Sequence, residues 1–324
     1  MTRTFESTKA TRGRGNLTIG LIGPSGGGKT YSALRLATGI QRVDPGPIFV
    51  IDTEARRATH YAPTEGESVD PSKGRFDFHH VEFLAPFGSL DYLEAIDHCI
   101  SLGAKTIIID SMSHEHEGEG GMLDRHESEC LRLMKEWQKD RNTVQFSAWA
   151  VPKAERNRLK QRMLQIPANF ILCYRAKDKL KPVKGKEPEK LGWMPIGDLV
   201  FLFEMTVCAL LLPGAGGVPT WAPEEAGEKM LTKLPGYLAN VFGGSPRPLD
   251  EAAGEAMAKW AAGGVVVAPT DDEAAAVVEQ VNRAQTAQAL DEVTSIARLR
   301  DWAPNQHKAI GEAVKARKAA LSKR

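Results

Sequence analysis

The sequence GPSGGGKT at residues 23–30 decides the fold, because it matches the pattern G-x-x-x-x-G-K-[ST] of a phosphate-binding loop. Its glycines allow backbone N–H groups to turn inward around phosphate oxygens. Asn16 to Gly23 predicts a short apolar strand before the loop, and Tyr31 to Ile40 predicts a helix after it. That helix points its N-terminus at the same anion, so the motif lies in the context that it requires.

Three side chains in this region define a site for a nucleotide and a metal ion. We expect Lys29 to reach the β- and γ-phosphate oxygens and Thr30 to ligate Mg²⁺. Asp110 ends an apolar stretch, KTIIID, where its carboxylate lies beside the loop and holds the magnesium shell. The expected cofactors are ATP and Mg²⁺. The alternatives are a glycine-rich turn with a solvated lysine and, for Asp110, a helix cap or a surface carboxylate.

The rest of the chain alternates apolar strands with helices. Further strands are predicted at Pro47–Asp52, Phe76–Phe83, Lys105–Asp110, Asn169–Tyr174 and Phe203–Leu212. Helices are predicted at Tyr92–Leu102, Met122–Lys139 and Pro152–Gln165. This spacing suits right-handed crossovers, and uninterrupted apolar strands indicate a parallel sheet buried on both faces. The expected fold class is therefore α/β with a mainly parallel sheet.

Composition divides the 324 residues into four parts. We expect a flexible basic tail at 1–15, one doubly wound domain at 16–262, a linker at 263–272 and a C-terminal helical hairpin at 273–324. No apolar run approaches the about 20 residues of a membrane helix, and the polar N-terminus lacks the apolar core of a signal peptide. We therefore expect no membrane partner. The four cysteines are scattered, which predicts free thiols in a reducing cytoplasm.

The catalytic base must lie outside the strand that ends at Asp110, because the next residue is Ser111 rather than the glutamate of many ATPases. The stretch FVIDTE at 49–54, followed by Tyr61-Ala62, resembles the RecA recombinase segment that carries the catalytic glutamate of that family. Ile109-Asp110-Ser111 resembles its magnesium motif. The order and spacing of these motifs agree with those of RecA.

A closer resemblance is to a phage family of RecA-like nucleotide-binding proteins that includes the Sak-type single-strand annealing ATPases. It rests on DTE-x-R at 52–56, DSMSHE at 110–115, Trp149 before a basic helix, and RAK at 175–177. The resemblance covers about residues 16–262. It implies a RecA-like P-loop core and, for a phage-encoded protein, a place in the host cell cytoplasm.

The resemblance also implies roles for five residues. Glu54 is expected to orient the attacking water as the catalytic base. Tyr61 matches the aromatic residue that stacks on adenine in RecA, and Ser111 would relay a hydrogen bond near the γ-phosphate. Arg175 and Lys177 would sense the γ-phosphate or act across a subunit interface. The expected nucleotide contacts are Gly23, Pro24, Ser25, Gly26, Gly27, Gly28, Lys29, Thr30, Tyr31, Tyr61 and Ser111.

Simpler interpretations of these residues stay open. Glu54 can be a surface acid paired with Arg56 or Arg57, Tyr61 can be a half-buried surface tyrosine, and the two cations at 175 and 177 can be solvated. The sequence HEHEGE at 114–119 looks like a set of metal ligands, but it has no third remote partner. We predict a glycine-rich mobile loop there, beside the ATP site.

A basic segment follows, with eleven Lys or Arg against two acids between Lys153 and Lys186, a net charge of +9. Its end, Lys179–Lys190, lies between two predicted strands, where RecA keeps its second DNA-binding loop. Cations on such a loop can contact a nucleic-acid backbone, and Trp193 could stack on a base. The residues predicted to bind nucleic acid are Lys179, Lys181, Lys184 and Lys186. The alternative is a solvated basic hairpin.

These features favour an ATPase that acts on single-stranded DNA in recombination or annealing. We expect a homo-oligomer, because RecA-like sites often lie between subunits, and a single-strand-binding protein as a further partner. A nucleotide-dependent assembly protein with little DNA role is the second hypothesis. A small-molecule kinase ranks below both, because no arginine-rich lid is recognisable. A partition ATPase would have an extra lysine where Pro24 and Ser25 stand.

Overall fold

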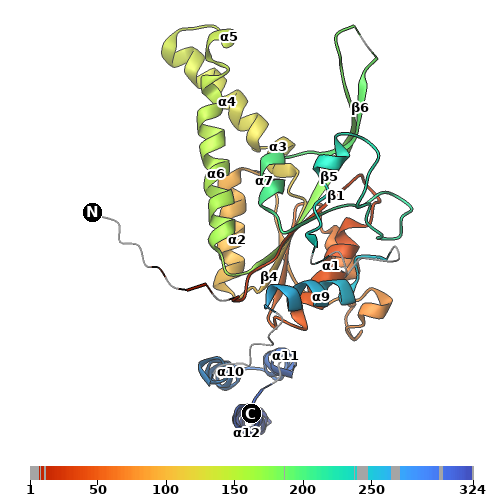
Figure 1. Cartoon of the computed structure of the whole chain (residues 1–324). Helices are drawn as coiled ribbons and strands as arrows, with labels where there is room; N and C mark the ends of the chain where they lie inside the picture. Colours follow the sequence, from red (N-terminus) through yellow and green to blue (C-terminus); the bar gives the residue numbers. More distant parts are fainter. Residues whose placement is uncertain are drawn as a thin grey trace.

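The computed structural model describes residues 12–185, 187–236, 247–263, 271–298 and 302–322, with Ser7, Lys9, Ala10 and Leu238. This part of the chain has an α/β fold around a mostly parallel seven-stranded sheet (Figure 1). The strand order is β3-β2-β4-β5-β1-β7, and β6 pairs antiparallel with β5 outside this order. The prediction of an α/β fold with a mainly parallel sheet is therefore confirmed.

The strands form where the sequence has short apolar runs, and every residue of the second and fourth strands is buried. Their bounds are β1 Thr18–Gly23, β2 Ile48–Asp52, β3 His79–Glu82, β4 Thr106–Asp110, β5 Asn169–Lys181, β6 Glu189–Pro195 and β7 Val207–Leu210. The fifth strand is longer than its apolar part, because residues 176–181 pair with β6 as a two-stranded hairpin.

One predicted strand, Phe203–Leu212, is wrong in its first part. Residues Leu199–Glu204 form the short helix α7, and only Val207–Leu210 form a strand. The Asp198 side chain accepts a hydrogen bond from the Val200 N–H and so caps the helix. A continuous apolar run does not by itself distinguish a short helix from a strand.

Alternate residues of each strand supply two cores, one on each face of the sheet. Leu21 and Ile108 pack on the face covered by α1 (Lys29–Gln41) and α9 (Glu251–Ala261). Ile22 and Ile109 pack on the other face, under α2 (Ser89–Ser101), α6 (Ala150–Gln165) and α7. The sheet is thus buried on both sides, and the carboxyl ends of its parallel strands meet at one edge.

Two glycines let α1 and α9 pack closely. A Cβ atom at Gly39 would lie 2.0 Å from the Glu251 carbonyl oxygen, and one at Gly254 would lie 2.2 Å from the Leu36 carbonyl oxygen. Arg35 also forms an ion pair of 2.6 Å with the Glu251 side chain. These contacts hold the helix that follows the phosphate-loop sequence.

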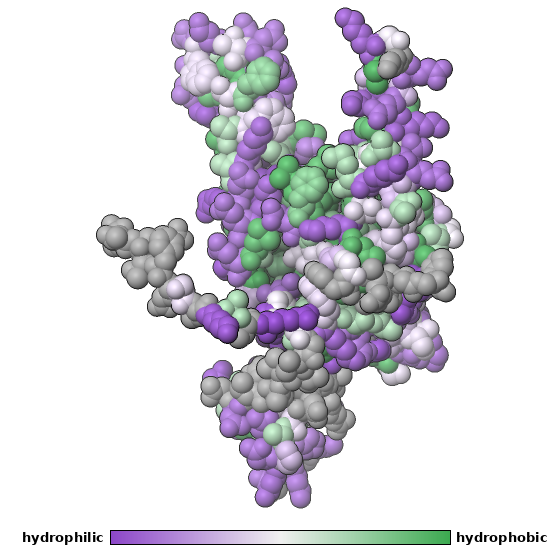
Figure 2. All heavy atoms as spheres, viewed as in Figure 1, coloured by the Kyte–Doolittle hydropathy of each residue, from purple (hydrophilic) through white to green (hydrophobic). Residues whose placement is uncertain are grey.

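Two projections extend beyond the sheet (Figure 1). One consists of α4 (Met122–Trp137), α5 (Arg141–Val144) and the first part of α6, and the other is the β5–β6 hairpin. Figure 2 shows that the hairpin surface is largely hydrophilic. The remaining short helices are α3 His114–Glu117, η1 Arg57–Tyr61, η2 Pro71–Lys73, η3 Ser147–Trp149 and η4 Glu228–Met230.

The C-terminal region contains three helices where a two-helix hairpin was expected. They are α10 Asp271–Arg283, α11 Ala287–Arg298 and α12 Pro304–Leu321, and they share small apolar clusters that include Trp302 and Ile310. The predicted linker lies largely outside the described residues, as does most of the predicted N-terminal tail. Within the described ranges, the search for a helix long and apolar enough to span a membrane finds none.

Candidate functional site

A cavity of about 740 Å³ lies at the carboxyl ends of the central strands. It brings together residues from four separate stretches that the sequence singled out. The predicted site residues that line it are Ser25, Gly26, Gly28, Lys29, Thr30, Tyr31, Glu54, Tyr61, Asp110, Arg175 and Lys177. Arg57, His60 and Glu117 also line it, and sequence reasoning did not assign them a role in the site.

The loop at residues 23–30 is a tight turn in which the Lys29 side chain is hydrogen-bonded to backbone carbonyl groups of the loop. Gly26 and Gly28 have φ values of 79° and 81°, which favour glycine. A Cβ atom at Gly23 would lie 2.1 Å from the Leu211 carbonyl oxygen, so this residue must also be small. The Lys29 ammonium donates to the carbonyl oxygens of Gly23 and Pro24, each at 2.9 Å. Helix α1 begins at Lys29, and its first N–H groups are available to an anion.

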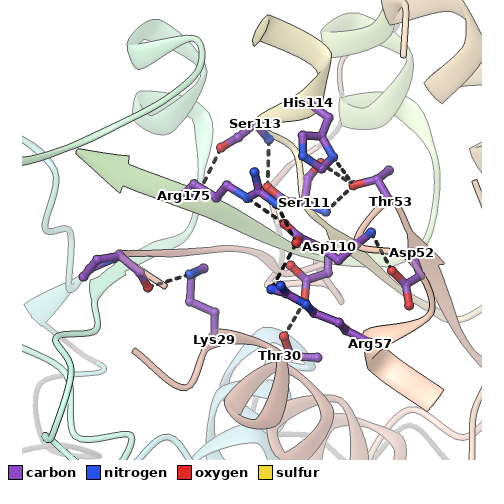
Figure 3. Close-up of polar contacts among 12 residues, drawn as sticks. Lys29, Thr30, Asp52, Thr53, Arg57, Asp110, Ser111, Ser113, His114 and Arg175 are labelled. Atoms are coloured by element: carbon purple, nitrogen blue, oxygen red, sulfur yellow. Dashed lines mark hydrogen bonds and ion pairs between the residues drawn. The ribbon is translucent and has the colours of Figure 1, made fainter. Parts of the chain in front are cut away.

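Thr30 and Asp110 meet beside this loop (Figure 3). The Thr30 hydroxyl donates to Asp110 Oδ2 at 2.5 Å, and Asp110 is only 4% exposed. Burial raises the pKa of Asp110 to about 6, with the Thr30 hydrogen bond acting against this rise and the nearby Glu54 charge adding to it. A carboxylate and a hydroxyl are oxygen ligands of the kind that Mg²⁺ binds.

Thr30 and Asp110 provide two oxygen ligands, which suits Mg²⁺ better than a metal ion whose ligands all come from the protein. Among the described residues, no group of three or more His, Cys, Asp or Glu side chains could hold a metal ion. Magnesium is commonly bound by one or two carboxylates together with water and substrate phosphates. Thr30 and Asp110 would hold it at the mouth of the phosphate loop.

Glu54 is positioned by a turn directly after β2. The Asp52 carboxylate accepts hydrogen bonds from the Glu54 N–H at 2.7 Å and the Ala58 N–H at 3.0 Å. Ala55 and Arg56 both have positive φ, which fixes a tight reversal. Asp52 therefore shapes the turn, a role that the sequence alone did not predict.

The main partner of Glu54 is Arg175, at the end of the buried part of β5. Arg175 Nε and Nη2 donate to the two carboxylate oxygens at 2.7 and 2.6 Å, and Arg57 contacts one oxygen at 3.4 Å. Burial alone would raise the pKa of Glu54, but the hydrogen bonds and charge of Arg175 outweigh it, and the pKa is lowered. Arg56, considered as a partner from the sequence, instead lies 3.6 Å from Glu82.

A second network ties the ends of three strands together behind the cavity (Figure 3). The Thr53 hydroxyl accepts from the Ser111 N–H at 2.7 Å and lies 2.8 Å from His114 Nδ1. The Ser113 hydroxyl accepts from the Arg175 N–H at 2.9 Å. Ser111, expected near the γ-phosphate, is fully buried and its hydroxyl accepts from the Ser113 N–H, so it does not line the cavity.

The HEHEGE segment contains a structured turn rather than the predicted loop. It forms α3, in which Glu115 is 3% exposed and makes a bidentate ion pair with Arg156, at 3.0 and 2.5 Å. The Ser89 hydroxyl also donates to Glu115. The fixed conformation depends on a partner 41 residues away in the sequence, so local glycine content was misleading.

Folding neutralises much of the basic segment. Six of its cations have acidic partners, all of them outside the segment: Arg156–Glu115, Lys160–Asp198, Arg162–Asp97, Arg175–Glu54, Lys177–Glu117 and Lys181–Glu189. Lys179 and Lys184 have no acidic partner among the described residues, and Lys186 lies outside them. Trp193 on β6 is half-buried against the core.

A smaller cavity of about 260 Å³ lies on the other side of the phosphate loop. Tyr31 lines both cavities, and its ring centroid is 5.5 Å from that of Tyr61. The other wall is the glycine-rich turn after β7, at residues 212–217, together with Arg35. Sequence reasoning missed this wall, although the closely spaced glycines at 214, 216 and 217 were a visible signal.

Comparison of the sequence with family models and with curated proteins gives no match. The chemical groups in the cavity are therefore the basis for a functional proposal. The cavity lies at the N-terminus of α1 and is lined by Lys29, by the hydrogen-bonded pair Thr30 and Asp110, and by the ion pair of Glu54 and Arg175.

Proposed function

We propose that this chain is a magnesium-dependent nucleoside triphosphatase, most simply an ATPase, with a RecA-like P-loop core. The observation that carries the proposal is the convergence of Lys29, Thr30, Asp110 and Glu54 on one cavity at the N-terminus of α1. The first two come from the phosphate loop, and the two acids come from the ends of other strands. Such a set can bind a polyphosphate, a cation and a water molecule together.

Each group has a distinct task in the proposed reaction. The backbone N–H groups and Lys29 bind the phosphates and stabilise the charge that develops on them. Thr30 and Asp110 hold Mg²⁺, which when bound neutralises β- and γ-phosphate charge. Glu54 orients the attacking water and accepts its proton. The rings of Tyr31 and Tyr61 line the cavity and offer an aromatic surface on which a nucleotide base can stack.

We further propose single-stranded DNA as the ligand coupled to hydrolysis, in a homo-oligomer of the phage RecA-like type. The supporting observation is that the same strand, β5, carries Arg175 in the cavity and Lys181 in the hairpin, with one shift of its pairing register with β6 between Lys179 and Leu180. The many ion pairs of the basic segment favour the second candidate, an assembly protein that binds nucleotide without DNA.

ATP turnover, measured with and without single-stranded DNA, tests both candidates. Lys29→Ala should nearly abolish turnover, whereas Glu54→Gln should retain nucleotide binding and lose about 10²- to 10⁴-fold in rate. Lys259→Ala, which removes a surface lysine paired with Glu255, is the control and should match wild type. Wild-type turnover in Lys29→Ala would contradict the ATPase proposal, and turnover indifferent to DNA would favour the assembly protein.

A further inference from the structure

Glu54 and Arg175 form an ion pair with two hydrogen bonds, and each side chain is the main partner of the other. Both carboxylate oxygens of Glu54 accept from the guanidinium, and Glu54 is only 9% exposed at its side chain. A carboxylate held in this way is a poor proton acceptor, because Arg175 stabilises its charged form. The arrangement therefore holds the proposed base in an unreactive state.

The charges that line the cavity leave few cations free to meet a terminal phosphate. Lys29 is bound to two carbonyl oxygens, and Lys177 lies 2.9 Å from Glu117. β5 lies between β1, which leads into the phosphate loop, and β4, which ends at Asp110. Arg175 stands where this part of β5 ends. A third phosphate that extends from the loop toward Asp110 must approach this guanidinium.

We infer that the Glu54 carboxylate and the terminal phosphate of a nucleoside triphosphate compete for Arg175, so that a triphosphate, but not a diphosphate, releases Glu54 for catalysis. The inference rests on the proposed function and adds a residue that discriminates between substrate and product. Arg175 is then a positioning residue for the base as well as a phosphate contact. A diphosphate lacks the competing group and leaves the ion pair intact.

Competition has a thermodynamic consequence that binding can measure. Breaking the ion pair opposes triphosphate binding, so Glu54→Ala should bind a non-hydrolysable triphosphate about tenfold more tightly than wild type. Affinity for the diphosphate should stay unchanged. In an Arg175→Met background, the same Glu54 substitution should give no gain, because the guanidinium for which the two groups compete is absent.

The experiment is a double-mutant cycle on the full chain, with calorimetric affinities for both nucleotides in the presence of Mg²⁺. Glu117→Gln is the matched control, since it removes one negative charge from the same cavity without touching Arg175. Its effect on triphosphate affinity should depend far less on Arg175 than that of Glu54→Ala, because Glu117 acts on Arg175 only through its charge and not through a hydrogen bond. Unchanged diphosphate affinity shows that each variant is folded.

The outcomes separate this inference from the function on which it rests. An equal gain from Glu54→Ala in both backgrounds would show simple repulsion between carboxylate and phosphate, and would overturn the competition. An equal gain for triphosphate and diphosphate would overturn it too. If the wild-type chain binds neither nucleotide, the proposed function fails first and the inference fails with it.

Discussion

Replacing Asp110 with asparagine should stabilise the nucleotide-free protein while removing a carboxylate from the proposed magnesium site. Burial raises the pKa of Asp110 from 3.8 to about 6, so its charged form is costly in the folded state. At about 1.4 kcal/mol for each pKa unit, this corresponds to about 3 kcal/mol at pH 8. Asparagine keeps an oxygen that can accept from the Thr30 hydroxyl and carries no charge.

The gain should depend on pH in a defined direction. A carboxyl whose pKa is higher in the folded state favours folding most below pH 3.8, and this contribution is lost as the pH rises through about 6. The variant should therefore exceed wild type by about 1.5 kcal/mol at pH 5 and by about 3 kcal/mol at pH 8. Above pH 8 the difference should be constant.

Chemical denaturation in the presence of a chelator measures this difference at each pH. Asp97→Asn is the matched control, because Asp97 is 45% exposed and pairs with Arg162 at the surface. It should show no gain that grows with pH. Two results would refute the reasoning. One is an Asp110→Asn variant that is less stable than wild type at pH 8, and the other is a difference in unfolding free energy that is the same at pH 5 and pH 8. Added Mg²⁺ and ATP should stabilise wild type and leave the variant nearly unchanged.

Two further predictions concern the hairpin and the helix pair beside the loop. Changing Lys179 and Lys184 to glutamine should weaken single-stranded DNA binding. It should also reduce the slope of log affinity against log salt concentration by about 0.7 for each DNA phosphate that is no longer neutralised. The measurement is affinity across a salt series, and equal slopes for variant and wild type would contradict the prediction. Gly39→Ala should destabilise the fold by about 1–3 kcal/mol, because its Cβ atom would lie 2.0 Å from the Glu251 carbonyl oxygen. The control in denaturation is Gly311→Ala on α12, where nothing lies within 4 Å and a gain of about 0.5–1 kcal/mol is expected.

The sequence predicted best those features that depend on neighbours along the chain. Buried strands such as Ile48–Asp52 and Thr106–Asp110 appear as apolar runs, and the turn between β1 and α1 appears as a cluster of glycines at residues 23–28. Each of these patterns is contained in a short stretch of sequence, although the strands themselves form by pairing with distant strands. The mainly parallel sheet then followed from the lengths of the connections.

Features that depend on distant partners were missed or mistaken. The turn at His114–Glu117 is fixed by Arg156. The hairpin beyond Tyr174 is fixed by pairing with β6, a strand that was not predicted although Leu191 and Trp193 alternate along it and pack against the core. The same limit applies to the site. Glu54 was identified through its family resemblance, but no local pattern shows that Arg175, 121 residues later, holds both of its oxygens.

Strand β5 connects the proposed nucleotide site with the proposed DNA site. Its buried half carries Arg175 into the cavity, and only four residues later Lys179 stands on the exposed hairpin. Lys177, between them, pairs with Glu117 on α3, and the Arg175 N–H donates to Ser113 just before that helix. A strand of nucleic acid bound to the hairpin would act on the same backbone that positions Arg175. The proposed coupling between DNA and hydrolysis would then need no large rearrangement, because a small shift of β5 would change the contact between Arg175 and Glu54.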